Sequence, residues 1–183
     1  PIEQTILLDV MAHYFITGAS SGIGAALVTR LLDDGHRVSA VARRAARLHS
    51  LGDAAGDRFL ALPADVCDAA ALYQAIDQAS ATLGTIDIAI LNAGIYTPQN
   101  ALQIDPQVYR THMEINYMGV VNALPRLIAG MGDAGSGKIA MVSSVAGWRG
   151  LPKAAAYGPT KAALISLAES ITFDLAPKGI DVR

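Results

Sequence analysis

A serine, a tyrosine and a lysine in this sequence could together move a proton. Tyr157 and Lys161 stand four residues apart in AAAYGPTKAAL, so on a helix they share one face and lie about one turn apart. Reducing a carbonyl by hydride requires a proton at the oxygen. A phenol ordinarily ionises at about pH 10, and a nearby ammonium favours its ionised form. Ser144 could hold the same oxygen while charge develops on it.

The position of Tyr157 and Lys161 relative to Ser144 is what favours a catalytic role for the pair. Taken alone, a tyrosine and a lysine at this spacing are most often an incidental surface pair. Here Ser144 lies in MVSSVAG, at the end of an apolar run that predicts a strand. Ligands of parallel sheets bind at the carboxyl ends of the strands, so we expect Ser144 and Tyr157 to face one pocket.

A glycine-rich turn occurs near the beginning of the sequence, in TGASSGIG. Glycine permits positive φ and close approach of a ligand, and a helix N-terminus after such a turn suits a pyrophosphate. We expect Gly18 to make the turn, Gly22 to lie beside the pyrophosphate and Gly24 to let the helix pack closely. A turn with packing glycines remains the alternative. The predicted phosphate-binding residues here are Gly18, Ser20, Ser21, Gly22, Ile23 and Gly24.

The segment after the second predicted strand indicates which dinucleotide binds. From Gly35 to Gly52 there is no Asp or Glu, and several arginines are present. An acid in this window would hold the ribose of NAD, whereas an arginine accommodates the 2′-phosphate of NADP. Arg43 is the first choice for that contact and Arg44 the second, the alternative being a solvated helix start. The sequence predicts NADP(H) as the preferred cofactor, with NAD(H) possible.

These residues require a scaffold that brings strand ends together. Apolar runs alternate with helix-period runs along the chain, which predicts βαβ units around a parallel sheet. We expect one doubly wound α/β domain of the Rossmann type, with helices on both faces of the sheet in a three-layer sandwich. The expected strands are near 12–17, 37–42, 58–62, 86–91 and 138–143, and the expected helices near 23–34, 45–51, 69–83, 106–131 and 154–176.

The motifs, taken in order, resemble those of the short-chain dehydrogenase/reductase family, single-domain oxidoreductase branch. They are TGxxxGxG from Thr17, the triplet Asn92, Ala93 and Gly94, then Asn116, Ser144 and the pair Tyr157 and Lys161. Ser21 departs from the TGxxGxxG pattern of extended members. The resemblance covers nearly the whole chain from Met11. Gly158 and Pro159 stand where alanine or small polar residues are commoner in the family.

The resemblance implies a role for each matching residue. Tyr157 would be the general acid/base, Ser144 would orient the carbonyl, and Lys161 would also hydrogen-bond the nicotinamide ribose. Asn116 would hold a water that relays protons to the lysine; alternatively it is a kink or capping residue. Asn92, Ala93 and Gly94 would line the cofactor site, and in PADVCD the pair Asp65 and Val66 would lie beside the adenine. Asp65 could instead cap a helix, although Asp68 is better placed for that.

Composition excludes several other classes of protein. The chain is 52% hydrophobic and 16% charged, with a net charge of −2 and a pI of about 6.1, which fits a globular domain and gives no basic field for nucleic acid. Cys67 is the single cysteine, and the four histidines show no metal-ligand spacing. No membrane segment is predicted. We expect a cytoplasmic protein without a metal.

Residues 1–10 read as an extension before a natural start at Met11, and residues 11–183 as one domain. KGIDVR resembles the opening of a sixth strand, which predicts that the C-terminal part of the domain is missing. The resemblance implies a homodimer or homotetramer through the two long helices. Tyr96, Leu102, Trp148 and Leu151 could line an apolar substrate pocket, although each is more often a packing residue.

Two hypotheses follow. The first is an NADP(H)-dependent oxidoreductase that transfers hydride between the nicotinamide and a carbonyl or secondary alcohol. The second is a catalytically silent dinucleotide-binding fragment that acts as a sensor or scaffold.

Overall fold

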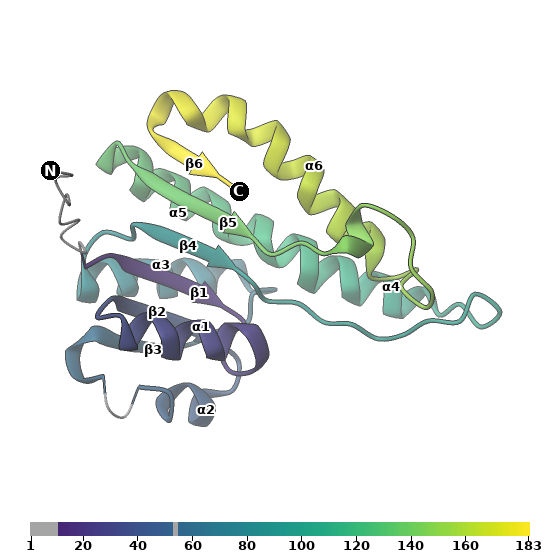
Figure 1. The fold of residues 1–183 in the computed structure, drawn as a ribbon, viewed down its shortest axis with the longest axis horizontal. Coiled ribbons are helices and arrows are strands. Elements are labelled where there is room, and N and C mark those ends of the chain that lie inside the picture. Colours follow the sequence, from purple (N-terminus) through teal and green to yellow (C-terminus); the bar gives the residue numbers. More distant parts are fainter. Residues whose placement is uncertain (1–10, 53–54) are drawn as a thin grey trace, which may run out of the picture.

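The described residues, 11–52 and 55–183 of a computed structural model, contain a six-stranded parallel sheet (Figure 1). The strand order is β3-β2-β1-β4-β5-β6. The predicted N-terminal extension lies outside the described residues. The strands are β1 (His13–Thr17), β2 (Arg37–Ala42), β3 (Phe59–Pro63), β4 (Ile88–Leu91), β5 (Gly137–Met141) and β6 (Ile180–Val182).

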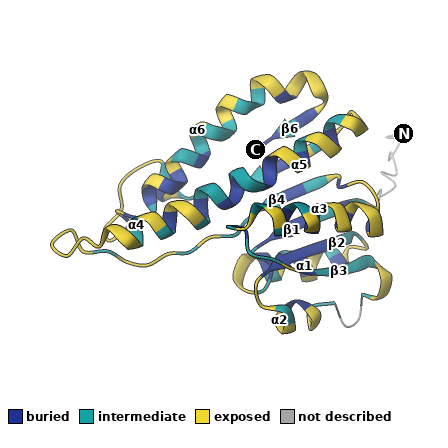
Figure 2. Cartoon of the chain, turned by 180° about the vertical axis from the view of Figure 1, so that it is seen from behind, coloured by how far each residue is buried: buried dark blue, intermediate teal, exposed yellow. Residues whose placement is uncertain are grey.

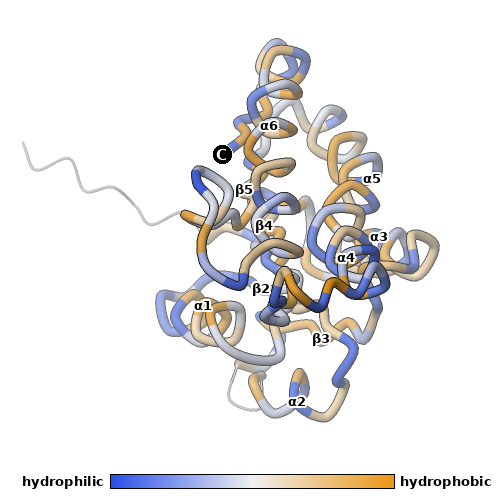
Figure 3. Tube along the Cα trace, turned by 90° about the vertical axis from the view of Figure 1, so that its right-hand side faces the viewer, coloured by the Kyte–Doolittle hydropathy of each residue, from blue (hydrophilic) through white to orange (hydrophobic). Residues whose placement is uncertain are grey.

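Helices cover both faces of the sheet, as the sequence predicts. Seen toward the carboxyl ends of the strands, α1 lies on one side, and α3 and α5 lie on the other (Figure 3). Among the described residues, no helix is long and apolar enough to cross a bilayer. The helices are α1 (Gly22–Asp33), α2 (Ala45–His49), α3 (Ala69–Leu83), α4 (Pro106–Met113), α5 (Gly119–Ala134) and α6 (Gly158–Leu175).

The core has two halves because successive strand residues point to opposite faces. Phe15 and Ile16 are both fully buried in β1. Phe15 packs with residues of α3 and α5, such as Leu72 and Leu127. Ile16 packs with α1 residues on the other face, among them Val28. The buried strands enclosed by more exposed helices are visible in Figure 2, and this double burial explains the continuous apolar runs.

Two helices begin where the sequence provides a side-chain cap. The Asp68 carboxylate accepts from the backbone N of Ala71 at 3.0 Å, so Asp68, and not Asp65, caps the helix that begins at 69, as its better placement in the sequence predicts. Asp105 caps α4 in the same way through Gln107, and Pro106 occupies the first turn, where its missing N–H costs nothing.

The expectation of one helix over 106–131 is wrong. A π-helical turn, η2 (Glu114–Met118), separates α4 from α5. It holds Asn116, and such turns insert a residue into a helix, often at functional sites. The helix expected from 154 begins only at Gly158, and β5 ends at Met141, before the expected 143.

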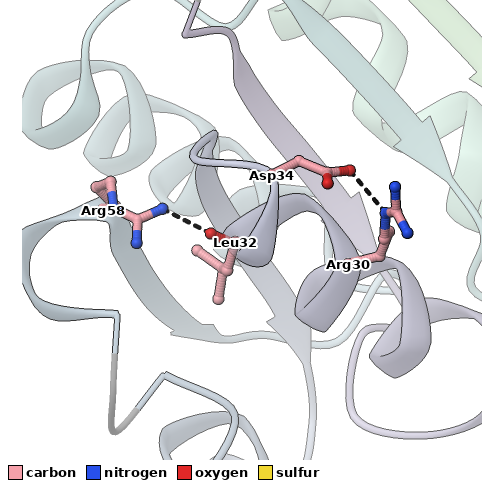
Figure 4. A network of polar contacts seen from close by, with 4 residues as sticks. All are labelled: Arg30, Leu32, Asp34 and Arg58. Atoms are coloured by element: carbon pink, nitrogen blue, oxygen red, sulfur yellow. Dashed lines mark hydrogen bonds and ion pairs between the residues drawn. The ribbon is translucent and has the colours of Figure 1, made fainter.

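An arginine just before β3 contacts the end of α1. The Arg58 guanidinium donates to the carbonyl oxygens of Leu32 at 2.8 Å and His36 at 3.3 Å. Arg30 and Asp34 form a separate exposed ion pair at 2.7 Å on the same helix (Figure 4). Arg58 therefore gives a charged donor to the Leu32 carbonyl in the last turn of α1, which also accepts from the backbone N of Gly35, and to the His36 carbonyl in the loop that follows.

Replacing Arg58 with alanine is expected to lower the free energy of unfolding by about 1–2 kcal/mol, because two carbonyls lose a charged donor. Chemical denaturation measures this. Arg30→Ala removes a guanidinium from the same helix end without uncovering a carbonyl and serves as the control. Equal losses in the two variants contradict a capping role for Arg58.

Candidate active site

The site lies where the strand order reverses. β1 pairs with β2 on one side and with β4 on the other. The helix after β1, α1, and the helix α5 after β4 therefore lie on opposite faces of the sheet (Figure 3). In a doubly wound sheet a crevice opens at this switch point, outside the carboxyl ends of the strands. The glycine turn follows β1 and the Asn92–Ala93–Gly94 triplet follows β4, so the topology brings these two motifs together.

Each glycine of the turn is required for a different structural reason. Gly18 and Gly22 have positive φ, +69° and +57°, which other residues rarely adopt. A Cβ on Gly18 would also lie 2.8 Å from the Cα of Ala93. A Cβ on Gly24 would collide with the carbonyl of Gly18 and lie 2.8 Å from Nδ2 of Asn92. The first turn of α1 can therefore approach the end of β4 closely.

Thr17 and Asn92 tie the turn to the end of β4. The Thr17 hydroxyl accepts from the backbone N of Asn92 at 3.0 Å and of Ala93 at 3.1 Å. The Asn92 amide donates to the Thr17 carbonyl at 3.1 Å. Asn92 therefore supports the backbone that forms the cradle.

A cleft of about 520 Å³ runs from the glycine turn along the strand ends. This volume is within the range of small-molecule and cofactor sites. All the predicted cofactor-binding residues line the cleft except Gly24, Tyr157 and Lys161. Its lining residues are Gly18, Ser20, Ser21, Gly22, Ile23, Ala42, Arg43, Arg44, Ala64, Asp65, Val66, Asn92, Ala93, Gly94, Ile95 and Ile115.

The two arginines after β2 point in different directions. Arg44 Nη2 donates to the hydroxyls of Ser20 at 2.8 Å and Ser21 at 2.7 Å. Arg43 instead faces Asp65, with 3.9 Å between Nη1 and Oδ2. The sequence analysis places Arg43 first for a phosphate. The structure brings Arg44 to the glycine turn and Arg43 to the end of β3.

Asp65 is held from two sides. Besides facing Arg43, its Oδ1 accepts from the backbone N of Cys67 at 3.0 Å. Burial and the neighbouring Asp65 carboxylate raise the pKa of the Cys67 thiol to about 11. The thiol is therefore protonated at neutral pH and is a poor nucleophile there.

Lys161 is almost fully buried and lies beside Tyr157. Its Nζ donates to the carbonyl of Val142 at 2.7 Å and lies 5.6 Å from the centre of the Tyr157 ring. A Cβ on Gly94 would lie 3.6 Å from this nitrogen, so the triplet after β4 also borders the lysine. Burial lowers the pKa of Lys161 to about 8.

The segment after β5 packs against the first turn of α6. It forms a short 3₁₀ helix, η3 (Val145–Gly147), and a Cβ on Gly147 would lie 2.8 Å from the carbonyl carbon of Lys161. The Ser144 hydroxyl accepts from the backbone N of Ala146 at 3.1 Å and keeps its hydrogen for another acceptor. Ser143 donates to the carbonyl of Lys161 at 2.9 Å and so ties this segment to α6.

Asn116 joins three segments around the lysine. Its Oδ1 accepts from the backbone N of Ile95 at 2.7 Å, and its Nδ2 donates to the carbonyl of Ile95 at 3.0 Å. The same Nδ2 donates to the Thr160 hydroxyl at 3.2 Å, which in turn donates to the carbonyl of Tyr157 at 2.7 Å. The π-helical turn is thus linked to the turn that carries Tyr157 and Lys161.

Sequence reasoning gave no role to three buried polar residues that organise this region. Thr17, Thr160 and His112 are each at most 2% exposed and hydrogen-bonded to backbone near the site. Thr17 begins the glycine motif and Thr160 lies between Tyr157 and Lys161, which is the one signal that could have found their roles. His112 gave none beyond its lack of metal-ligand spacing. Among residues 11–52 and 55–183, no three His, Cys, Asp or Glu side chains gather as metal ligands.

A parallel doubly wound sheet with a glycine cradle at its switch point and a Tyr–Lys pair at the end of the cleft defines a dinucleotide-binding oxidoreductase fold. Residues 12–183 match the family model described as short chain dehydrogenase, and the chain belongs to that family.

Similar proteins agree with this assignment. The chain is 35% identical to an uncharacterized oxidoreductase of Myxococcus xanthus over 91% of this chain and 67% of that protein. It is 35% identical to a 3-dehydrosphinganine reductase of Arabidopsis thaliana over 93% of this chain and 52% of that one. It thus spans about half to two thirds of their lengths.

Solved structures of related enzymes share the fold. A 3-ketoacyl-(acyl-carrier-protein) reductase of Brucella melitensis, solved in complex with NADH, superposes with a TM-score of 0.87 and 31% identity, over 92% of this chain and 71% of that one. A short-chain dehydrogenase of Streptomyces avermitilis gives a TM-score of 0.88 and 31% identity, over 94% and 64%.

Proposed function

We propose that the protein is an NADP(H)-dependent oxidoreductase acting on a carbonyl or secondary alcohol, with Tyr157 as general acid/base. The observation that carries the proposal is the placement of Lys161 Nζ 5.6 Å from the Tyr157 ring, beside the triplet that ends the glycine-lined cleft. The relatives include named reductases and dehydrogenases, which supports this reaction class.

The chain's own residues divide the work as follows. The Tyr157 phenol gives a proton to the carbonyl oxygen, or takes one from the alcohol, and the Lys161 ammonium favours its ionised form. The Ser144 hydroxyl, whose hydrogen is not used by Ala146, donates to the same oxygen. Asn116 fixes Ile95 and, through Thr160, the backbone at Tyr157, so it holds the turn that carries Tyr157 and Lys161 in place.

The remaining cleft residues fit a dinucleotide. The glycine turn offers backbone N–H groups at the start of α1 to a pyrophosphate, with the hydroxyls of Ser20 and Ser21 beside them. Asp65 and Val66, which line the cleft, would hold the adenine, and Lys161 would hydrogen-bond the nicotinamide ribose. When bound, NADPH would supply the hydride.

The phosphate of NADP(H) is assigned mainly to Arg44. Its guanidinium lies on the glycine turn, whereas Arg43 is partly engaged by Asp65. No carboxylate stands between Gly35 and Gly52 to repel a phosphate. Arg43 supplies a second positive charge to the same cleft.

The variant Arg44→Ser is expected to raise the KM for NADPH by about 10–100-fold, because it removes one charge-assisted hydrogen bond to the phosphate. The KM for NADH should change little. Kinetics with both cofactors measure this, and Arg47→Ser, an exposed position on α2, is the control. An equal change for both cofactors would contradict a role in reading the phosphate.

The whole proposal is tested by following NADPH oxidation by the intact protein with a panel of ketones. Turnover of at least one ketone supports the oxidoreductase. Binding of NADPH without turnover of any ketone or alcohol favours the silent sensor or scaffold instead. Tighter binding of NADH than NADPH contradicts the arginine argument.

We also propose a homodimer or homotetramer through the long helices and a cytoplasmic location. Phe173 on α6 is 81% exposed and Met113 on α4 is partly exposed, which supports a partner on these helices. The single Cys67 is typical of a reducing compartment. Sedimentation of the intact protein gives the oligomeric state.

A further inference from the structure

We propose that Tyr96 is a specificity-determining wall of the substrate site, positioned against Tyr157 by His112, and that this wall selects ketones or secondary alcohols with an apolar, ring-sized substituent. The substrate half of this inference rests on the proposed function, whereas the positioning half rests on the free protein alone.

The segment between β4 and α4 forms neither helix nor strand, yet its backbone is fixed at alternate residues. Ile95 is held at both its N–H and its carbonyl by Asn116. The backbone N of Thr97 donates to Nε2 of His112 at 3.0 Å. The backbone N of Gln99 donates to the carbonyl of Lys153 at 3.0 Å. Tyr96 lies between two of these fixed residues, so its ring has a defined direction.

The hydrogen bonds of His112 leave its Nε2 as the acceptor for the backbone N–H of Thr97. Its Nδ1 lies 2.7 Å from the carbonyl of Val108, which can only accept, so Nδ1 carries the hydrogen. Nε2 is then an acceptor, and it faces the N–H of Thr97. The side chain of His112 is fully buried. His112 stands one helical turn before Asn116, and the two residues together hold 95 and 97.

The fixed segment sets Tyr96 beside the proposed reacting group. The Tyr96 and Tyr157 ring centres are 5.2 Å apart with their planes at 67°, an edge-to-face contact of the kind aromatic pairs favour. Tyr96 is nevertheless 52% exposed, so part of its ring is available beside the Tyr157 phenol. The exposed part of the ring is mostly apolar, whereas the Ser144 and Tyr157 hydroxyls that would hold the carbonyl oxygen are polar.

A second apolar surface adjoins the other proposed oxygen ligand. Val145, the residue after Ser144 in the chain, is 71% exposed. An exposed aromatic ring therefore contacts Tyr157, and an exposed apolar residue directly follows Ser144. A substrate oriented by Ser144 and Tyr157 would place its substituents against these surfaces, where an apolar ring is favoured over a small or charged group.

The positioning half is tested by amide hydrogen exchange in the free protein. His112→Phe keeps the ring but removes the acceptor, and His112→Gln restores an acceptor near the Nε2 position. We expect faster exchange at the amide of Thr97 in the Phe variant and near-normal exchange in the Gln variant. Unchanged exchange in His112→Phe, measured on a variant that melts cooperatively, overturns the assignment. If His112→Phe does not fold, the His112→Gln variant is used alone. Rapid exchange at the amide of Thr97 in His112→Gln would then overturn the assignment.

The substrate half is tested by comparing acetophenone with acetone, using NADPH. Tyr96→Ala is expected to lower the ratio of kcat/KM for acetophenone to kcat/KM for acetone about tenfold, mainly through a higher KM for acetophenone. Tyr96→Phe should behave as the wild type. A uniform loss on both ketones, or none on either, overturns the specificity role.

The two failures are distinguishable. A wild-type protein that turns over no ketone overturns the proposed function together with the substrate half, while the exchange experiment still decides whether His112 positions the segment. A wild-type protein that turns over ketones, with Tyr96→Ala affecting acetophenone and acetone equally or neither of them, removes only the specificity role.

Discussion

The variant Tyr157→Phe is expected to lower kcat by about 10²–10⁴-fold, the contribution of a positioned general acid. Without its hydroxyl the ring cannot give a proton to the substrate oxygen, and the transition state loses its acid. The affinity for NADPH should change little, because the phosphate-binding end of the cleft is built from other residues. The edge-to-face contact with Tyr96 needs only the ring, so the pocket keeps its shape.

Steady-state kinetics and a fluorescence titration with NADPH measure the two expectations. Tyr73→Phe on α3 is the matched control, since Tyr73 does not line the cleft. Normal turnover by Tyr157→Phe would assign the proton to another group. Loss of NADPH binding together with turnover would indicate a general structural defect.

The sheet could be predicted because its signals are local and redundant. The runs IDIAIL at 86–91 and KIAMV at 138–142 are largely apolar, and they coincide with β4 and with all of β5 but its first residue. Helix-period segments come between such runs, and this alternation predicts parallel strands that are buried on both faces. The glycines at 18, 22 and 24 could also be interpreted from local sequence, because a tight turn before a helix needs them. Gly18 and Gly22 have positive φ, and Gly24 leaves no room for a Cβ.

The side-chain contacts of the site could not be predicted in the same way. Arg43 and Arg44 are adjacent and identical, and only the fold shows that one reaches Ser20 and the other Asp65. His112 contacts a residue fifteen positions away through a loop without periodicity. The π-helical turn at Asn116 arises from tertiary hydrogen bonds, which override the local helical pattern.

The variant Lys161→Met is expected to be inactive and, at neutral pH, more stable than the wild type. Loss of the ammonium beside Tyr157 should lower kcat by about 100-fold or more. Burial depresses the pKa of Lys161 from 10.5 to about 8, which corresponds to about 3 kcal/mol of destabilisation of the charged form. Removing the donor to Val142 costs about 1 kcal/mol, so the net gain is about 2 kcal/mol.

The pH dependence of this difference has a definite sign. Below pH 8 the lysine is charged in both the folded and the unfolded chain, so the full penalty of burying the ammonium is present in the wild type. Between pH 8 and 10.5 the unfolded chain binds more protons than the folded one, so wild-type stability rises with pH and the advantage of Met shrinks. Above about 10.5 the variant should be the less stable protein, because only the lost hydrogen bond remains.

Denaturant titrations of both proteins at pH 7 and at pH 10 test this, with Lys178→Met at an exposed position as the control. A variant that is both inactive and more stable places the reason for the buried ammonium in the reaction, since folding alone would favour its loss. A Met variant that is less stable at pH 7 would show instead that the ammonium holds Val142 and β5 in place, and the proton-transfer argument would lose its physical basis.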